Sequence, residues 1–289
     1  MRFTKMQGVG NDFVVLDAAS LPEDADLAIL AIRLCERHFG VGADGLLVAG
    51  RDAPSAAFSM RMFNPDGTED MCGNGLRCAG LWAHRAGWVK RDESFDVATK
   101  EGPKAMRLLE VAEDGRAARL RVGMGLPKFA PAEIPFCGGS GWVIGYPLSV
   151  GDVTYHITAM NTGSTHSVIF GLVPPDELTF QRVSPLIELH PLFPERTTVL
   201  WATPQGDSTI AVRIWERGVG ETLGCGTGAC AVGVAAQLYH TVGMGDVRSP
   251  VKVMSKGGTL EIDWAGEGYP VNMSGPAEFV FDGEFVGCP

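Results

Sequence analysis

The sequence predicts an α/β (α+β) protein of two pseudo-symmetric domains, each a curled, barrel-like sheet around one central helix. The first observation is a motif of the form Cys-Gly-x-Gly that occurs twice, at 72–75 and at 225–228. Each copy leads into small and apolar residues of helical character, and short alternating segments typical of strands lie on both sides of it. The length of 289 residues also suggests about two domains.

The two motifs are related by a fixed shift along the chain. Cys225 follows Cys72 by 225 − 72 = 153 positions. The same shift pairs Gly10 with Gly163, Val15 with Val168, Gly67 with Gly220 and Gly80 with Gly233, and a shift of 156 pairs Val97, Lys100 and Gly102 with Val253, Lys256 and Gly258. A constant shift with one small insertion indicates an internal duplication. We therefore expect one domain from residues 1–126 and 276–289, a second from 127–275, and the active site in the cleft between them.

Each half contains elements of the same kinds in the same order. In the first half we expect a turn and strand within 6–17, a helix at 27–38, a glycine turn at 40–45, a strand at 58–63, a helix at 76–86 and a hairpin turn at 113–116. In the second half we expect a turn and strand within 160–170, a helix at 180–189, a strand at 209–215, a helix at 229–239, and strands at 251–254 and 260–264. Residues 127–147, rich in proline and glycine, mark the expected junction. The uncharged stretch 222–245 predicts a buried helix and not a membrane span, because six glycines interrupt it.

Composition excludes several classes of function. The chain is 45% hydrophobic and 20% charged, as in soluble globular proteins, and a net charge of −10 argues against a nucleic-acid partner. Seven cysteines without regular disulfide spacing indicate a reducing compartment. The N-terminus has too short an apolar run for a signal peptide, so we expect a cytoplasmic protein with no membrane contact.

The chemistry is expected at the two cysteine motifs. Glycines let backbone N–H groups approach a ligand closely, and the start of a helix favours both an anion and a thiolate. Cys78 and Cys230 follow at five or six positions, which turns them to another face of the helix, so we expect them in the core. No metal-ligand spacing, P-loop or dinucleotide fingerprint is present.

Two acidic cysteines facing one substrate would explain why the motif is repeated. One, as a thiolate, would remove a proton from carbon, and the other, as a thiol, would return a proton to the opposite face, which inverts the stereocentre. Two alternatives remain open at this point. One is a hydrolase or transferase with a single cysteine nucleophile beside His166; the other is a redox or metal-binding module without turnover.

The motifs together resemble those of the diaminopimelate epimerase family. They are Met6-x-Gly8-x-Gly10-Asn11-Asp12-Phe13, Phe63-Asn64-x-Asp66-Gly67, Cys72-Gly73-Asn74-Gly75-x-Arg77-Cys78, Glu216-Arg217-Gly218-x-Gly220-Glu221-Thr222 and Cys225-Gly226-x-Gly228-Ala229-Cys230. The resemblance runs from Met6 to about Gly283. It implies the family fold and interconversion of LL- and meso-diaminopimelate for lysine and peptidoglycan synthesis. It implies no cofactor, neither pyridoxal phosphate nor metal. The candidate assembly is a homodimer.

The resemblance also implies roles for individual residues. Cys72 and Cys225 would be the acid/base pair, with His166 and Glu216 beside the thiols. The other expected substrate contacts are Asn11, Asn64, the N–H groups of Gly73, Asn74, Gly226 and Thr227, Glu216, Arg217 for the distal carboxylate, and Ser164 and Thr198. Ser164 and Thr198 stand where the family often has asparagine, and Gly45 stands where some members have glutamine. A racemase of another amino acid, such as histidine, is therefore the alternative substrate assignment.

Overall fold

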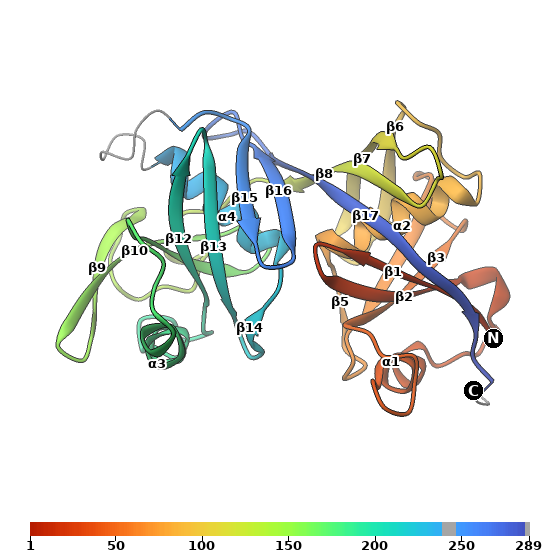
Figure 1. The fold of residues 1–289 in the computed structure, drawn as a ribbon, viewed down its shortest axis with the longest axis horizontal. Coiled ribbons are helices and arrows are strands. Elements are labelled where there is room, and N and C mark those ends of the chain that lie inside the picture. The colour runs from red at the N-terminus through yellow and green to blue at the C-terminus, as the bar shows by residue number, and fades with distance from the viewer. Residues whose placement is uncertain (239–246, 287–289) are drawn as a thin grey trace. The chain divides into compact units, whose positions relative to one another are not determined.

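The computed structural model describes residues 1–238 and 247–286 and divides the chain into two compact units (Figure 1). Unit 1 consists of Met1–Gly123 together with Ser274–Pro289, and unit 2 consists of Met124–Met273. The strand β17 (Val271–Glu284) begins at the end of unit 2 and lies for most of its length in unit 1.

Eight strands of unit 1 close into a barrel. In order around the sheet they are β17, β1 (Arg2–Gly8), β2 (Asn11–Asp17), β3 (Gly45–Gly50), β4 (Phe58–Phe63), β6 (Ser94–Thr99), β7 (Gly102–Val111) and β8 (Ala117–Gly125), which pairs with β17 again. The pairs β2–β3 and β4–β6 are parallel. The short strand β5 (Glu69–Asp70) adds to β4 and leads directly to Cys72. The predicted curled sheet is thus confirmed for this half.

The helix α2 (Gly73–Arg85) packs against strands β1, β2, β3, β4 and β7 of this barrel. All residues from Gly73 to Ala83 are buried, Arg77 among them, so the helix is enclosed on every side. Gly80 allows the close approach, because a Cβ there would lie 2.7 Å from a Leu120 methyl carbon. A second helix, α1 (Leu27–Cys35), is capped by Asp26 and covers β3 and β4 with Leu30 and Leu34. A short 3-10 helix, η1 (Ala18–Ser20), follows β2.

Unit 2 repeats this plan. Its strands are β9 (Val143–Val150), β10 (Val153–Asn161), β11 (Thr165–Phe170), β12 (Thr198–Gly206), β13 (Thr209–Glu216), β14 (Gly220–Thr222), β15 (Val251–Ser255) and β16 (Gly258–Asp263). The pairs β11–β12 and β13–β15 are parallel, at the places of the two parallel pairs in unit 1. The helix α4 (Gly226–Leu238) packs against β10, β11, β12, β15 and β16, and α3 (Glu177–Glu188) against β9, β12 and β13.

Two strand pairs reproduce the shifts of 153 and 156 that the sequence shows. Phe13 pairs with Gly45 in unit 1, and His166 pairs with Thr198 in unit 2, so both partners are shifted by 153 (166 − 13 and 198 − 45). Further along, Val97 pairs with Lys104 and Val253 with Leu260, both shifted by 156. The insertion expected from the sequence therefore falls between the central helix and the strand that follows it.

Element ends differ from the sequence expectation where a cap decides them. The first helix ends at Cys35 and not near His38, because Glu36 leaves the helical conformation and the N–H groups of Val41 and Gly42 bond back to the Leu34 carbonyl. The helix expected from Phe180 starts three residues earlier, because Asp176 caps it. Residue 239, at the expected end of the last helix, lies outside the described residues. No helix among the described residues is long and apolar enough to cross a membrane.

Candidate active site

Cys72 is the residue immediately before helix α2, in the N-cap position. Its backbone is extended, with φ −132° and ψ 120°, and its carbonyl accepts the first helical hydrogen bond from Leu76 N–H. The N–H groups of Gly73 and Asn74 therefore belong to the first turn, where a helix offers them no internal carbonyl. The half-buried thiol lies at a point of the chain that suits an anion.

Asn11 contacts this thiol, and Asn74 bonds Asn11. The Cys72 Sγ lies 3.6 Å from Oδ1 of Asn11, the first residue of β2, and Asn74 Nδ2 donates to the same oxygen at 3.3 Å. Arg77, fully buried one turn along α2, donates to Asn74 Oδ1 at 2.8 Å and to the Pro276 carbonyl at 3.0 Å. Three residues of the candidate site thus contact one another, and the buried guanidinium fixes one of them, Asn74.

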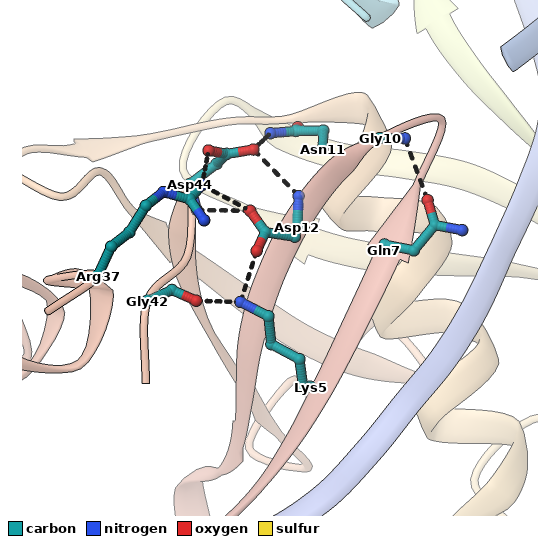
Figure 2. Close-up of polar contacts among 8 residues, drawn as sticks. All are labelled: Lys5, Gln7, Gly10, Asn11, Asp12, Arg37, Gly42 and Asp44. Atoms are coloured by element: carbon teal, nitrogen blue, oxygen red, sulfur yellow. Dashed lines mark hydrogen bonds and ion pairs between the residues drawn. The ribbon is translucent and has the colours of Figure 1, made fainter. Parts of the chain in front are cut away.

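An ion-pair network contacts Asn11 through Asp44 (Figure 2). Asp44 Oδ2 accepts from Asn11 Nδ2 at 2.8 Å, and Arg37 Nη2 donates to Asp44 Oδ1 at 2.7 Å and to Asp12 Oδ1 at 3.1 Å. Lys5 donates to the Gly42 carbonyl and lies 2.6 Å from Asp12 Oδ2. Burial alone would raise the pKa of Asp12, but the hydrogen bonds from Lys5 and Arg37 outweigh it and hold that pKa below its usual value.

The second cysteine turn has its own hydrogen bonds. Cys225, 8% exposed, precedes α4, and its Sγ accepts from the Gly228 N–H at 3.4 Å and lies 3.4 Å from Thr227 Oγ1. An N–H donor directed at sulfur stabilises a thiolate. Thr162 Oγ1 donates to the Thr227 carbonyl at 2.8 Å, which ties the helix start to the β10–β11 turn. Gly163 in that turn has φ +120°, and a Cβ there would lie 2.7 Å from Thr227 Cγ2.

His166 points into the interior of unit 2. It is fully buried in β11, and its Nε2 lies 3.2 Å from Ser164 Oγ, two residues earlier on the same side of the chain. Among the described residues, no group hydrogen-bonds its Nδ1. Burial lowers the pKa of His166 to about 3, and the charge of Arg217 acts in the same direction. The imidazole is therefore neutral at physiological pH.

The remaining predicted residues of unit 2 lie around the end of β13. Thr198 Oγ1 accepts from the Arg217 N–H at 3.1 Å, and Thr222 Oγ1 donates to Glu216 Oε2 at 2.9 Å. The exposed Arg217 side chain donates to the Glu195 carbonyl at 3.2 Å. Thr198, found where asparagine was expected, thus binds the backbone of the residue predicted to hold the distal carboxylate.

Asn64 of unit 1 and Glu216 of unit 2 occupy equivalent positions. Met62 pairs with Asp70, and Ile214 pairs with Thr222, so a shift of 152 relates these strands (214 − 62 and 222 − 70) and places Asn64 on Glu216. Asn64 Nδ2 donates to Thr68 Oγ1 at 3.0 Å, within its own turn. No described hydrogen bond joins Asn64 to Asn11, so the site residues of unit 1 form one joined group and one separate residue.

The family model for diaminopimelate epimerase matches residues 3–130 and 158–280. The diaminopimelate epimerase of Desulforudis audaxviator is 45% identical over 291 aligned positions, covering 99% of both chains, and that of Pelotomaculum thermopropionicum is 46% identical with the same coverage. The chain belongs to the diaminopimelate epimerase family. A crystal structure of a PhzF-family phenazine biosynthesis protein from Bacillus anthracis superposes with a TM-score of 0.70 at 19% identity, covering 99% of both chains, which supports the fold alone.

The cysteines outside the two motif positions differ in burial. Cys78 and Cys230 are fully buried, which confirms them as core residues, and burial raises the pKa of Cys78 and of the buried Cys35 to about 12. Cys137 is exposed, and Cys288 lies outside the described residues.

Sequence reasoning missed three residues that contact the candidate site: Arg77, Asp44 and Glu188. Arg77 and Asp44 lie inside or close to the glycine-rich motifs, so their place beside a site residue was a usable signal. No signal in the sequence indicated Glu188, because it ends a helix whose sequence is typical of a surface helix. In the structure Glu188 is 5% exposed, and its carboxylate accepts from the Gly218 N–H at 2.9 Å.

Proposed function

We propose that this protein epimerises LL-2,6-diaminopimelate to meso-diaminopimelate without a cofactor, with Cys72 and Cys225 as the two acid/base groups. It is an isomerase that supplies lysine and peptidoglycan synthesis. The observation that carries the proposal is the pair of cysteine turns, each at the start of a buried helix, in a chain of this family. The comparisons give no support to a racemase of another amino acid such as histidine.

In the proposed reaction, one thiolate removes the Cα proton and the other thiol protonates the opposite face. A free thiol has a pKa of about 8.5, so the enzyme must favour the thiolate on one cysteine and the thiol on the other. Such a coupled pair gives a bell-shaped dependence of rate on pH. The hydrogen bond from Gly228 N–H to the Cys225 sulfur supports the thiolate on that side.

The backbone supports the developing charge. As the proton leaves, the substrate carboxylate takes on enediolate character, and N–H donors fixed in advance stabilise that charge most effectively. We assign this task to the N–H groups of Gly73, Asn74, Gly226 and Thr227, which lie in the first turns of α2 and α4.

Side chains would hold the rest of the substrate. Arg217 suits the distal carboxylate, because a guanidinium binds a carboxylate through two parallel hydrogen bonds. Asn11, Asn64, Ser164 and Thr198 would contact the substrate, and Thr198 also fixes the Arg217 backbone. Neutral His166 and Glu216 would stand beside the thiols and adjust their protonation.

Incubation with LL-diaminopimelate in D₂O tests the function directly. We expect deuterium to enter at one Cα with conversion to the meso isomer, followed by NMR, in the presence of a metal chelator and without added pyridoxal phosphate. Incorporation on another amino acid but not on diaminopimelate would refute the substrate, and no incorporation on any would refute the epimerase.

A cytoplasmic location and a homodimer complete the proposal. Six described cysteines are free thiols, which fits a reducing compartment. The helix α3 and its C-cap residue expose Leu178, Leu186 and Leu189, each more than half accessible, and all three fall on one side of the helix. A second copy of the chain covering them would remove an apolar patch from water. Light scattering after size exclusion should give twice the chain mass.

A further inference from the structure

We propose that Asp44 is a positioning residue for Cys72. Acting through the amide of Asn11, it holds a hydrogen-bond acceptor against the thiol and keeps the proton on this cysteine. The inference rests on the proposed function only in treating Cys72 as an acid/base group.

Asp44 leaves the amide of Asn11 only one orientation. An ionised carboxylate accepts hydrogen bonds and donates none. Asp44 Oδ2 accepts from Asn11 Nδ2 at 2.8 Å and from the Asp12 N–H at 3.1 Å. The NH₂ end of Asn11 must therefore face Asp44, and its carbonyl oxygen faces Cys72 Sγ at 3.6 Å.

The contacts of Arg77 and Asn74 require the same orientation of the Asn11 amide. A guanidinium only donates, so Asn74 must present its carbonyl oxygen to Arg77 Nη2, at 2.8 Å. Asn74 then presents its NH₂ to Asn11 Oδ1, at 3.3 Å. Flipping the Asn11 amide would set two NH₂ groups against each other on one side and leave Asp44 facing an oxygen on the other.

The network of Figure 2 holds Asp44 itself in place. Arg37 Nη2 donates to both carboxylates, and the Asp44 N–H donates to the Asp12 carbonyl at 2.9 Å. Lys5, 8% exposed at its side chain, lies 2.6 Å from Asp12 Oδ2. Because Asp12 lies beside Asn11 on β2, the network fixes the carboxylate of Asp44 relative to the amide that it orients.

A carbonyl oxygen beside a cysteine discriminates between its two protonation states. It accepts a hydrogen bond from the thiol, but it repels a thiolate, because both then carry negative charge. The charged groups on the elements around Cys72 include Arg77 on α2, Lys5 on β1, Asp12 on β2, Glu69 and Asp70 on β5, and Arg37 and Asp44 in the connection between α1 and β3. Among them, Asp44 is the one that bonds the NH₂ group of Asn11.

Alkylation by iodoacetamide across a range of pH tests the inference without substrate. The alkylation rate of each cysteine is followed by mass spectrometry of its peptide. The pH at which this rate is half its maximum, the midpoint, reports thiolate formation, and the plateau of the rate at high pH reports how accessible the sulfur is. In Asp44→Ala we expect a lower midpoint for Cys72, so that its rate below the midpoint rises about two- to tenfold, the effect of losing one hydrogen bond to the thiol. The midpoint of Cys225 should not move.

Removing Asp44 also removes a negative charge, which alone would favour a thiolate, and a double-mutant cycle separates the two effects. If Asp44 acts through the amide, Asn11→Ala lowers the Cys72 midpoint by itself, and in that background Asp44→Ala adds only the smaller shift that the lost charge causes. The matched control is Asp70→Ala, a carboxylate two residues from Cys72 that accepts from the Met71 N–H at 2.7 Å. It removes a nearby negative charge without touching Asn11, so it should lower the midpoint by less than Asp44→Ala does.

Two results would overturn the inference: an equal shift from Asp44→Ala with and without Asn11, or an unchanged midpoint in Asn11→Ala. The second result decides the matter even if Asp44→Ala fails to fold. The outcome is independent of the proposed function, because a protein that never epimerises diaminopimelate still yields both midpoints.

Discussion

The carboxylate of Glu188 binds the backbone of Gly218. Its Oε1 accepts from the Gly218 N–H at 2.9 Å, and its Oε2 accepts from Trp215 Nε1 at 2.8 Å. Glu188 ends α3 and is only 5% exposed. The two bonds anchor the end of β13 and the turn after it, which carry Glu216 and Arg217, to a helix that makes no proposed contact with substrate.

Glu188→Gln should weaken this anchor. One oxygen becomes an NH₂ group that cannot accept, so a part-buried N–H donor loses its bond to a charged acceptor, at a cost of about 1–3 kcal/mol in the free energy of unfolding. Urea denaturation measures the loss. Because the turn carries Arg217, the KM for diaminopimelate should rise more than kcat falls.

Glu177→Gln is the matched control on the same helix. Glu177 is 71% exposed at its side chain and lies 3.0 Å from Arg213 Nη2. A solvent-exposed pair contributes little, so we expect a change within about 0.5 kcal/mol. Equal losses in the two variants would show that Glu188 contributes no more than a surface charge.

His166 should make the protein less stable as the pH falls. Its pKa is about 3 in the folded protein, against an ordinary value of 6.5 that the unfolded chain retains, so between these values the unfolded chain binds the extra proton. Stability from this group is therefore complete above pH 6.5 and is lost as pH falls toward 3, at up to about 1.4 kcal/mol per pH unit.

His166→Gln isolates that effect. The variant loses the titrating group, so its free energy of unfolding should fall less steeply than that of the wild type from about pH 6.5 to about pH 4, as followed by urea denaturation at each pH. Replacing the exposed His156 should leave the slope unchanged. A wild-type slope in His166→Gln would mean that other groups cause the acid sensitivity.

Each central helix approaches its sheet at a glycine. A Cβ at Gly233 would lie 2.6 Å from Ile262, and one at Gly80 would lie 2.7 Å from Leu120. Alanine at either position should therefore destabilise its own unit by about 1–3 kcal/mol, the usual cost of overpacking. Gly141→Ala, with nothing within 4 Å, is the control in thermal unfolding and should change little.

The sequence alone was sufficient to predict the features that the duplication repeats in both halves. The shift that pairs Gly80 with Gly233 also predicts two similar sheets, and the parallel pairs Phe13–Gly45 and His166–Thr198 follow it. A repeated pattern is visible in a single sequence because its two copies serve as each other's comparison.

Residues that act through tertiary contacts were not predictable in this way. Asp44 lies 33 positions from Asn11, and Glu188 lies 30 from Gly218, in segments where an acidic residue is normally solvated. The role of Glu188 depends on where helix α3 ends, and the role of Asp44 depends on the direction in which its carboxylate oxygen points. The ends of α1 and α3 were likewise decided by caps and backbone bonds that periodicity does not specify.

Loss of either motif cysteine should separate proton exchange from inversion. Cys72→Ala and Cys225→Ala each remove one of the two proposed acid/base groups, so conversion of LL- to meso-diaminopimelate should fall by about 10²- to 10⁴-fold in both. The remaining thiolate can still remove and return a proton on its own face. Residual deuterium incorporation should therefore proceed with retention, from one stereoisomer in Cys72→Ala and from the other in Cys225→Ala, as NMR in D₂O would show. The exposed Cys137, changed to alanine, should retain full activity. Near-normal inversion in either motif variant would contradict the two-base mechanism and leave a single nucleophilic cysteine as the better account.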